Sequence, residues 1–291
     1  MLHNNYKIIF FGSAEFSVPI LETLMQNKMV DAVVSAPPKP RGRKQIITPT
    51  PISQMATQNQ IRAFEPEDLN DKKFLDQIKK IRPDLFLVAA YGKILPQALL
   101  EIPAGGAINI HGSLLPKYRG SSPLQVALLN GDKETGVSII KMDEKMDHGP
   151  IIHQFKIPIN PDETTASLLE KSFNQTAKIL PEIIKSSYSF YPDRGLKSNK
   201  QDDKQATYTK LIKKEDGFIP WKTLEKAKKA DGIEIERFIR AMTPWPGVWT
   251  INPQTQKRLK ILKARLENEK LIVDEVQWEG RKPTSGLPVL S

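Results

Sequence analysis

Short apolar runs alternate with amphipathic stretches through the first half of the chain. Five of these runs have the length of a buried strand, at residues 7–11, 30–35, 61–64, 84–90 and 107–111. An amphipathic helix is predicted over residues 71–81, where Phe74, Leu75 and Ile78 share one face. Strands separated by helices predict a parallel sheet of βαβ units, whose carboxyl ends form the edge that binds ligands. The most apolar run, residues 84–90, is expected at the centre of this sheet.

The pattern changes in the second half of the chain. Two further strands are predicted at residues 136–142 and 151–159, followed by a long helix over residues 164–184. Residues 187–206 have no apolar period and many polar side chains, which is typical of a linker. Beyond them, the pattern predicts one short helix and three strands of a small β-rich domain, at residues 235–242, 248–251, 258–266 and 271–278.

Composition excludes several classes of protein. The 291 residues include no cysteine and only 4 histidines, which excludes a disulfide framework, a cysteine-based zinc site, an iron–sulfur cluster and a thiol nucleophile. No run of 18 apolar residues appears, so no membrane span is expected, and the amino-terminal residues lack the apolar region of a signal peptide. A cytoplasmic protein is the expectation. Gly12 follows the first strand without a G-x-G-x-x-G pattern, so it supports a tight turn more than a dinucleotide site.

The excess positive charge lies mainly in the last third of the chain. The formal net charge is +10, yet residues 1–194 hold 23 basic and 20 acidic side chains, whereas residues 195–291 hold 20 and 13. Such an asymmetry favours a polyanionic partner such as nucleic acid. A soluble, lysine-rich surface is the alternative.

A long basic loop follows the second predicted strand, at the ligand-binding edge. Residues 36–51 are longer than a usual βα loop and contain no acidic side chain, but they carry four basic ones: Lys39, Arg41, Arg43 and Lys44. Arginine and lysine suit contacts with phosphate groups. The loop is therefore a candidate nucleic-acid contact, with a flexible surface loop as the alternative.

Two polar side chains lie in the carboxyl-terminal half of the predicted strand at residues 107–111. Asn109 and His111 share one face of this strand, about 6.6 Å apart. An asparagine amide can hold a carbonyl oxygen, and a histidine can shuttle a proton or stabilise an oxyanion. A structural, buried histidine is the alternative. Asp147, in the turn over residues 142–150, can orient such a histidine or accept a proton. The alternative is that this aspartate-rich segment is a turn without a catalytic role. The adjacent His148 is expected to be solvated or to support the site indirectly.

Several longer stretches carry a resemblance to a known enzyme family. They are FFGSAEFSVPIL at 10–21, AYGKILP at 90–96, INIHGSLLPKYRGSSPLQVALLNGDKETGVSI at 108–139, MDHGPII at 146–152 and RAMTPWPGVW at 240–249. Together they resemble the methionyl-tRNA formyltransferase family. The stretch at 108–139 resembles all formyltransferases that use 10-formyltetrahydrofolate, including those acting on glycinamide ribonucleotide and on sugars. The narrower assignment depends on the basic loop and on the basic, tryptophan-rich C-terminal region.

The resemblance implies an α/β fold with a Rossmann-like formyltransferase domain and a smaller C-terminal OB-like β-barrel domain. The implied boundaries are 1–188 for the folate-binding catalytic domain, 189–206 for a linker and 207–291 for a tRNA-binding domain. The implied substrates are 10-formyltetrahydrofolate and initiator methionyl-tRNA, with no metal, no membrane partner and a monomeric chain.

The resemblance also assigns roles to particular residues. The family's catalytic positions correspond to Asn109, His111 and Asp147. Its folate-binding positions correspond to Ser113, Leu114, Leu115 and Pro116, together with Ala90, Tyr91 and Gly92. Arg41 stands where the family places an arginine that enters the tRNA acceptor stem, and Arg43 and Lys44 are expected to assist it. One departure is His148, which replaces the small hydroxyl residue that often follows the catalytic aspartate.

Three alternatives remain beside this interpretation. A formyltransferase acting on a small amine, such as an amino sugar nucleotide, would show no salt-sensitive tRNA binding. A nucleic-acid-binding module with an inactive enzyme domain would not turn over 10-formyltetrahydrofolate, and the intact Asn109, His111 and Asp147 set argues against it. A formyltetrahydrofolate dehydrogenase would need a thiol in its second domain, and this chain has no cysteine.

Overall fold

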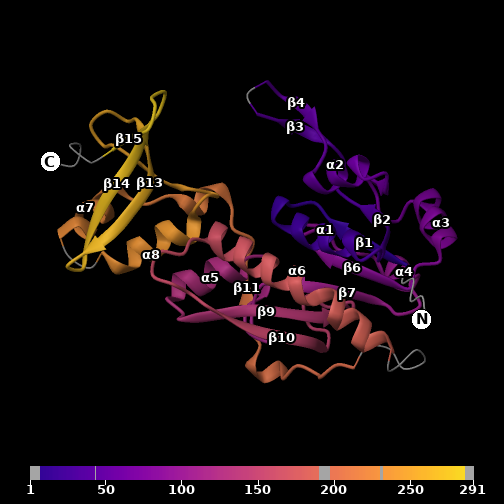
Figure 1. Ribbon diagram of the computed structural model, residues 1–291. Helices are drawn as coiled ribbons and strands as arrows, with labels where there is room; N and C mark the ends of the chain where they lie inside the picture. The colour runs from indigo at the N-terminus through magenta and orange to yellow at the C-terminus, as the bar shows by residue number, and fades with distance from the viewer. Residues whose placement is uncertain (1–6, 43, 190–196, 230–231, 286–291) are drawn as a thin grey trace. The chain divides into compact units, whose positions relative to one another are not determined.

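A computed structural model describes residues 7–42, 44–189, 197–229 and 232–285 of the chain (Figure 1). These residues form two compact units, each built from three segments that alternate with those of the other unit along the sequence. The first unit comprises residues 1–119, 136–156 and 170–206, and the second comprises residues 120–135, 157–169 and 207–291. None of the helices in the described residues is both long enough and apolar enough to cross a membrane.

A seven-stranded sheet is the framework of the first unit. Its order is β10-β9-β7-β6-β1-β2-β5. The strands, in chain order, are β1 (Ile8–Gly12), β2 (Val30–Val34), β5 (Arg62–Phe64), β6 (Leu85–Ala89), β7 (Ala107–His111), β9 (Glu134–Lys141) and β10 (Ile151–Pro158). All seven coincide with predicted strands to within two residues, and β6 is central as expected.

Strand direction changes partway across this sheet. The five strands for which the alternation predicts a parallel arrangement are parallel, from β5 through β2, β1 and β6 to β7. β9 instead runs antiparallel to β7, with Ile108 opposite Lys141 and His111 opposite Ser138. An apolar run records burial and not direction, so periodicity alone does not predict this reversal.

The helices of the first unit cover the sheet with apolar faces. They are α1 (Val18–Gln26), α2 (Pro51–Gln58), α3 (Lys72–Ile81) and α4 (Gln97–Leu100), and the long α6 (Thr165–Ser189) contributes its residues from 170 onward. α3 matches its predicted range because Asp71 caps it, accepting a hydrogen bond from the backbone N–H of Phe74 at 2.7 Å. Phe74 and Ile78 lie on its buried face and pack into a core with residues of β1, β2, β6 and β7.

The basic loop after β2 contains a hairpin that the hydrophobic pattern did not predict. β3 (Lys39–Arg41) and β4 (Ile46–Thr48) pair antiparallel, with Arg41 opposite Ile46. The hairpin extends beyond α2 (Figure 1). Its strands have no buried face, so there is no alternation for a sequence pattern to record.

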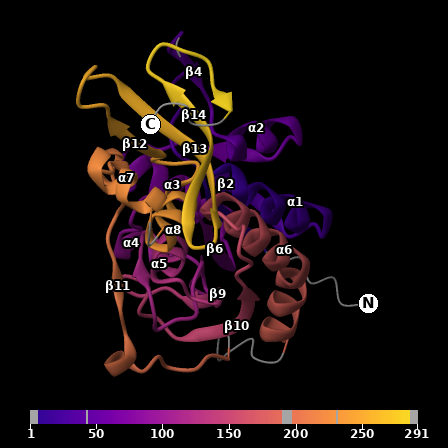
Figure 2. The same ribbon diagram turned by 90° about the vertical axis from the view of Figure 1, so that its left-hand side faces the viewer.

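The second unit combines helices with a four-stranded antiparallel sheet. Its helices are α5 (Pro123–Asn130), α7 (Trp221–Lys229) and α8 (Ile233–Met242). Its main sheet has the order β12-β13-β14-β15, from Val248–Ile251, Arg258–Glu267, Lys270–Trp278 and Thr284–Ser285. Two-residue strands β8 (Arg119–Gly120) and β11 (Tyr208–Thr209) form a separate pair. Figure 2 shows the long β13–β14 hairpin beside α8 and α7, against which it packs.

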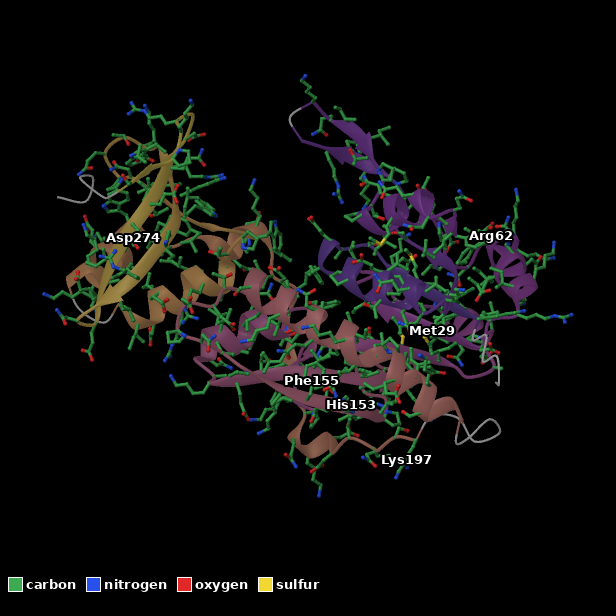
Figure 3. The ribbon with its side chains drawn as sticks, viewed as in Figure 1. Met29, Arg62, His153, Phe155, Lys197 and Asp274 are labelled. Atoms are coloured by element: carbon green, nitrogen blue, oxygen red, sulfur yellow. The ribbon has the colours of Figure 1, made fainter. Side chains whose placement is uncertain are left out.

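Part of the predicted linker follows the edge of the large sheet. Residues 190–196 lie outside the described residues, but residues 197–206 are described. Asn199 exchanges two backbone hydrogen bonds with Ile151, at 2.7 and 2.8 Å. Figure 3 labels Lys197 on this segment and His153 and Phe155 on β10, beside which the segment runs.

Candidate active site

The end of β7 presents two polar side chains on one face, as the alternation predicts. Asn109 is half-buried, and only 6% of His111 is exposed. β7 lies between β6 and β9 in the sheet and is hydrogen-bonded to both strands, so its end is held in position. The strand thus delivers an amide and an imidazole to the carboxyl edge of the parallel strands.

Asp147 completes a cluster with these two side chains. Asn109 donates from Nδ2 to Oδ1 of Asp147 at 3.2 Å. His111 Nδ1 lies 3.4 Å from the other carboxylate oxygen, Oδ2. The structure therefore brings together all three predicted catalytic residues, although 38 positions separate Asn109 from Asp147. We call these three residues the polar cluster.

Both ring nitrogens of His111 face hydrogen-bond acceptors. Nδ1 faces the carboxylate of Asp147, and Nε2 lies 2.8 Å from the backbone carbonyl oxygen of Tyr118. A carbonyl oxygen can only accept, so Nε2 carries a proton. A proton on Nδ1 would point at the Asp147 carboxylate.

The loop that carries Asp147 is held by polar contacts that the sequence did not predict. Asp147 itself has a left-handed backbone, with φ of +49°. Gln201 contacts the loop from the segment after residue 197, and the buried Arg119 contacts Gln201. Glutamine and arginine have no local pattern that marks such a role, because both are ordinary surface residues in most sequences.

His148 is part of a charged group beside the polar cluster. Its Nδ1 lies 2.7 Å from Asp143, and its Nε2 lies 3.4 Å from Asp203. Arg119 donates to Asp203 at 2.7 Å, and this hydrogen bond, with the nearby His148, holds the pKa of the Asp203 carboxyl below its usual range. His148 is therefore half-buried and paired rather than fully solvated.

The predicted folate-binding stretch after β7 is held rigidly against β9 and β10. The hydroxyl of Ser138 donates to the backbone oxygen of Ser113 at 2.6 Å and accepts from the backbone N–H of Leu115 at 3.1 Å. Gln154 donates to the backbone oxygen of Leu115 at 3.0 Å. Ser113 and Leu115 are buried, while Leu114 and Pro116 are half-exposed at the surface of this stretch.

The second predicted folate-binding stretch follows β6. Ala90 and Gly92 both have positive φ, of +52° and +81°, so the chain turns sharply here. The backbone N–H of Ser13 donates to the oxygen of Ala90 at 3.2 Å, which ties the ends of β1 and β6 together. Tyr91 points into the core, where its ring packs edge-on against Phe11 with centroids 5.5 Å apart.

The Tyr91 hydroxyl is buried in this apolar setting. Its oxygen has no hydrogen-bond partner among the described residues. Burial raises the pKa of the Tyr91 phenol to about 12. The side chain therefore contributes to the core beneath the turn, and the backbone of the turn is the part available to a ligand.

Two of the three predicted tRNA-binding residues lie on the described part of the β3–β4 hairpin. Arg41 ends β3 and is exposed, as is Lys44 in the turn, whereas Arg43 lies outside the described residues. Ile46 and Ile47 on β4 are also 62% and 69% exposed. The hairpin thus combines positive charge with apolar surface that nothing in its own unit buries.

Buried hydroxyls close the base of this hairpin. Ser35 and Thr50, one on each side of it, share a hydrogen bond of 2.6 Å. Ser35 also donates to the backbone oxygen of Gly12 at 2.7 Å, and the Ser13 hydroxyl accepts from the backbone of Ala36 at 3.1 Å. These bonds anchor an exposed arm to the ends of β1 and β2.

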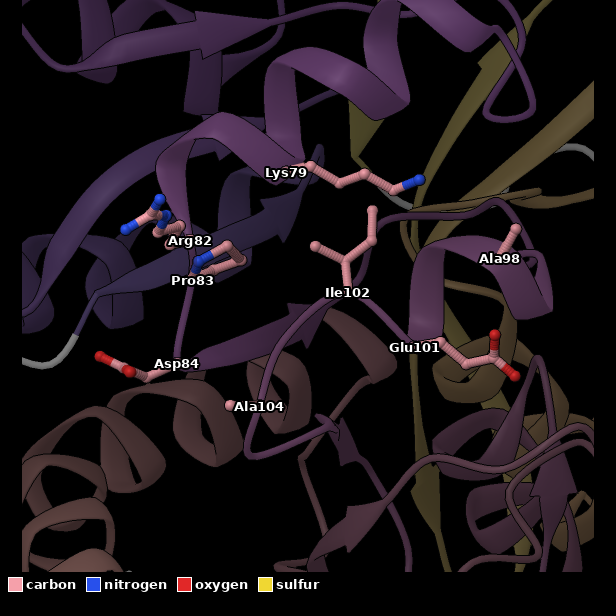
Figure 4. A pocket seen from close by; sticks show the side chains of 8 residues that line it. All are labelled: Lys79, Arg82, Pro83, Asp84, Ala98, Glu101, Ile102 and Ala104. Carbon is pink, nitrogen blue, oxygen red and sulfur yellow. The ribbon is translucent and has the colours of Figure 1, made fainter.

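A separate hollow lies at the opposite, amino-terminal end of β6. It has a volume of about 630 Å³ and is lined by Lys79, Arg82, Pro83, Asp84, Ala98, Glu101, Ile102 and Ala104 (Figure 4). Its charged side chains point in different directions around the hollow, so no set of polar groups converges on one position (Figure 4). We place the functional site at the polar cluster and not here. Within the described ranges, no group of three or more His, Cys, Asp or Glu side chains could hold a metal ion.

Comparisons with known proteins match both parts of the chain to known families. The formyl transferase family matches residues 6–184, and the formyl transferase C-terminal domain family matches residues 211–275. A methionyl-tRNA formyltransferase of Caldanaerobacter subterraneus is 38% identical over 262 residues, which cover 89% of this chain and 81% of that protein.

Two solved structures share the fold. One is a methionyl-tRNA formyltransferase from Clostridium thermocellum, with a TM-score of 0.63, 19% identity, and coverage of 94% of this chain and 99% of that one. The other is HypX from Aquifex aeolicus in complex with tetrahydrofolic acid, with a TM-score of 0.64, 15% identity, and coverage of 91% and 38%. From the family matches and the identity to relatives over most of their length, this chain belongs to the formyl transferase family and, within it, to the methionyl-tRNA formyltransferases.

Proposed function

We propose that this chain transfers the formyl group of 10-formyltetrahydrofolate to the α-amine of methionine on initiator methionyl-tRNA. The observation that carries the proposal is the convergence of Asn109, His111 and Asp147 at the carboxyl edge of the sheet. An amide, an imidazole and a carboxylate can supply the oxyanion donors and the proton acceptor that acyl transfer to an amine uses. The name of the 38% identical relative supports the same reaction.

The polar cluster suits a reaction that develops negative charge on oxygen. Attack of the amine on the formyl carbon forms a C–N bond and a tetrahedral centre, and the carbonyl oxygen becomes an oxyanion. The Asn109 amide directs an N–H donor at Asp147, and Nδ1 of His111 faces the same carboxylate, so N–H donors at these two positions suit an oxyanion. Collapse of this centre breaks the bond to the folate nitrogen, and this nitrogen takes up a proton in place of the one that the amine gives to Asp147.

The spacing within the cluster leaves donors available to a substrate. The 3.4 Å between His111 and Asp147 exceeds the roughly 2.8 Å of a charge-assisted hydrogen bond, so this N–H can be shared with a ligand oxygen. The Asn109 amide makes one hydrogen bond within the described part of the chain, which leaves a second N–H for the formyl oxygen. The Asp147 carboxylate faces Nδ1 of His111 and is placed to receive the proton that the attacking amine loses.

The formyl donor is assigned to the two rigid stretches beside the cluster. Ser113, Leu114, Leu115 and Pro116 follow His111 directly, and Ala90, Tyr91 and Gly92 follow the neighbouring strand β6. The half-exposed side chains of Leu114 and Pro116, with the turn backbone at residues 90–92, suit a flat heterocycle that needs both apolar contact and hydrogen bonds. No metal takes part in this proposal.

The tRNA is assigned to two basic regions. Arg41 and Lys44 on the hairpin, together with Arg43, would contact the acceptor stem. A C-terminal domain over 207–291 would contact phosphates more diffusely. The net charge of +7 over residues 195–291 supports the second assignment. In this proposal residues 1–188 form the catalytic domain, residues 189–206 form the linker, and the protein acts as a cytoplasmic monomer.

A formylation assay tests the proposal. Purified protein with 10-formyltetrahydrofolate is expected to formylate charged initiator tRNA much faster than charged elongator tRNA. The assay should be repeated at several salt concentrations, because phosphate contacts weaken steeply with salt. Formylation of an amino sugar nucleotide in preference to charged tRNA would overturn it in favour of a small-amine formyltransferase.

A further inference from the structure

The loop that carries Asp147 is held by the side-chain amide of Gln201. The Nε2 of Gln201 donates to the backbone oxygen of Asp147 and to that of Gly149, both at 2.8 Å. Gln201 is 54 positions from Asp147 and lies in the segment that the sequence predicts as a linker. Both amide protons are used, so the side chain bridges the two ends of this short turn.

Arg119 determines which way the Gln201 amide points. Its Nε and Nη2 donate to the Oε1 of Gln201 at 3.1 and 2.9 Å. Arg119 is only 1% exposed, so its guanidinium has little freedom to move. A flipped amide would face its NH₂ group toward the guanidinium and its oxygen toward two carbonyl oxygens, so only one orientation is favourable.

The turn needs such support because its backbone is constrained. Asp147 has a φ of +49°, a region that costs a non-glycine residue about 1–2 kcal/mol. Gly149 cannot carry a side chain, because a Cβ atom there would lie 1.8 Å from the backbone oxygen of Lys141. The carboxylate of Asp147 reaches Asn109 and His111 only while this strained path is maintained.

We propose that Gln201 is a positioning residue for formyl transfer: held by Arg119, it clamps the Asp147 turn and keeps the carboxylate at Asn109 and His111. This inference rests on the proposed function of the polar cluster. Gln201 acts through the backbone and touches none of the three side chains in the cluster. The segment from 197 to 206 is then part of the active-site scaffold as well as a connection along the chain.

The substitution Gln201→Glu separates the clamp from general packing. Glutamate has the same shape and still accepts from Arg119, but it places an oxygen against the two carbonyl oxygens instead of an NH₂ group. We expect kcat to fall about 10- to 100-fold, while KM for 10-formyltetrahydrofolate and for charged tRNA changes by less than about twofold. Gln201→Met, which has neither donor nor acceptor but a similar length, is expected to behave in the same way.

Gln205→Glu is the matched control in the same segment. Gln205 is exposed and donates only to Asp202 in the described residues, so its substitution is expected to leave kcat unchanged. Wild-type kcat in both Gln201 variants, or an equal loss in the Gln205 variant, would overturn the inference. Parallel increases in KM for both substrates would overturn it too, since they indicate a general loss of structure.

Hydrogen exchange tests the clamp without using activity. Peptides covering residues 142–150 should exchange about tenfold faster in Gln201→Glu than in the wild type, and at the wild-type rate in Gln205→Glu. If the wild type did not formylate tRNA, the proposed function would fail, yet this exchange difference would still establish the clamp. Unchanged exchange in Gln201→Glu would refute the clamp even if formylation occurred.

Discussion

The polar cluster and the β3–β4 hairpin lie in the same unit of the molecule but hold their polar side chains in opposite environments. In the cluster, His111 is 6% exposed and its ring nitrogens have acceptors on both sides. On the hairpin, Arg41 is exposed on a two-stranded ribbon without a buried face. We therefore expect the buried groups to act through geometry and the exposed ones to act through charge.

This difference predicts different kinetic signatures for the two regions. Groups that stabilise charge in a water-excluded site lower the barrier of the chemical step, whereas exposed cations mainly strengthen binding of a polyanion. Substitutions in the cluster should reduce kcat, and those on the hairpin should raise KM for tRNA. The following tests could break or sharpen this comparison, beginning with the largest effect.

Removal of a cluster side chain should have the largest effect. Asn109→Ala, His111→Ala and Asp147→Ala are each expected to lower kcat about 10²- to 10³-fold, because in the proposed reaction each removes a group that faces the reacting atoms. Steady-state formylation of charged tRNA measures the change, with thermal melting to establish that each variant folds. If all three folded variants kept a rate near that of the wild type, the cluster would not be the catalytic site.

Loss of charge on the hairpin should have a smaller and different effect. Arg41→Ala is expected to raise KM for charged tRNA about tenfold and to weaken its salt dependence, because one phosphate contact is lost. Folate binding, measured by titration, should not change. Arg62→Ala is a suitable control, since Arg62 is an exposed cation on β5 (Figure 3). An equal effect of the two substitutions on KM for tRNA would argue against a role specific to the hairpin. An equal loss of folate and tRNA binding in Arg41→Ala would argue against it as well.

The buried hydroxyls of Ser35 and Thr50 join the exposed hairpin to the buried sheet. Thr50→Val and Ser35→Ala each break the 2.6 Å hydrogen bond that closes the hairpin. Thr50→Val also removes the N-cap of α2, where Thr50 accepts from the backbone N–H of Ser53, and Ser35→Ala removes the hydroxyl that donates to the backbone oxygen of Gly12. We expect each to lower the free energy of unfolding by about 1–3 kcal/mol and to raise KM for tRNA without reducing kcat. A loss of kcat at unchanged KM would mean that this base supports the cluster instead.

Tyr91→Phe should have the smallest effect, and one that depends on pH. The phenol has no hydrogen-bond partner within the described ranges, so its removal should change stability by less than about 1 kcal/mol at neutral pH. The raised pKa of about 12 means that the folded state keeps this proton between pH 10 and 12 while the unfolded state loses it. Stability should therefore fall as pH rises from 10 to 12, by up to about 1.4 kcal/mol per pH unit.

Denaturant unfolding at several pH values measures this dependence. The wild type should lose more stability than Tyr91→Phe over that range, and the two curves should coincide below pH 9. Weaker folate binding by Tyr91→Phe at neutral pH would instead show that the hydroxyl contacts the ligand.

The local pattern of the sequence determined most of the secondary structure and the pairing of two of the three residues in the polar cluster. The strands of the large sheet and the helix at residues 72–81 follow from apolar periodicity, because burial of a regular element repeats at the period of that element. The pairing of Asn109 with His111 on one face follows from alternation in a strand. The motifs in these segments, read beside known families, were enough to indicate the reaction.

Tertiary structure alone decided what depends on contacts between distant residues. The sequence placed Asp147 in a turn by itself, and folding brings its carboxylate to within 3.2 Å of the Asn109 amide. It placed Gln201 in a linker, where nothing local distinguishes this glutamine from its neighbours. The antiparallel direction of β9 and the exposed β3–β4 hairpin were likewise hidden. A hydrophobic pattern indicates which positions of a helix or strand are buried. A site depends instead on which residues far apart in the sequence come into contact, and only the packing of the whole sheet determines those contacts.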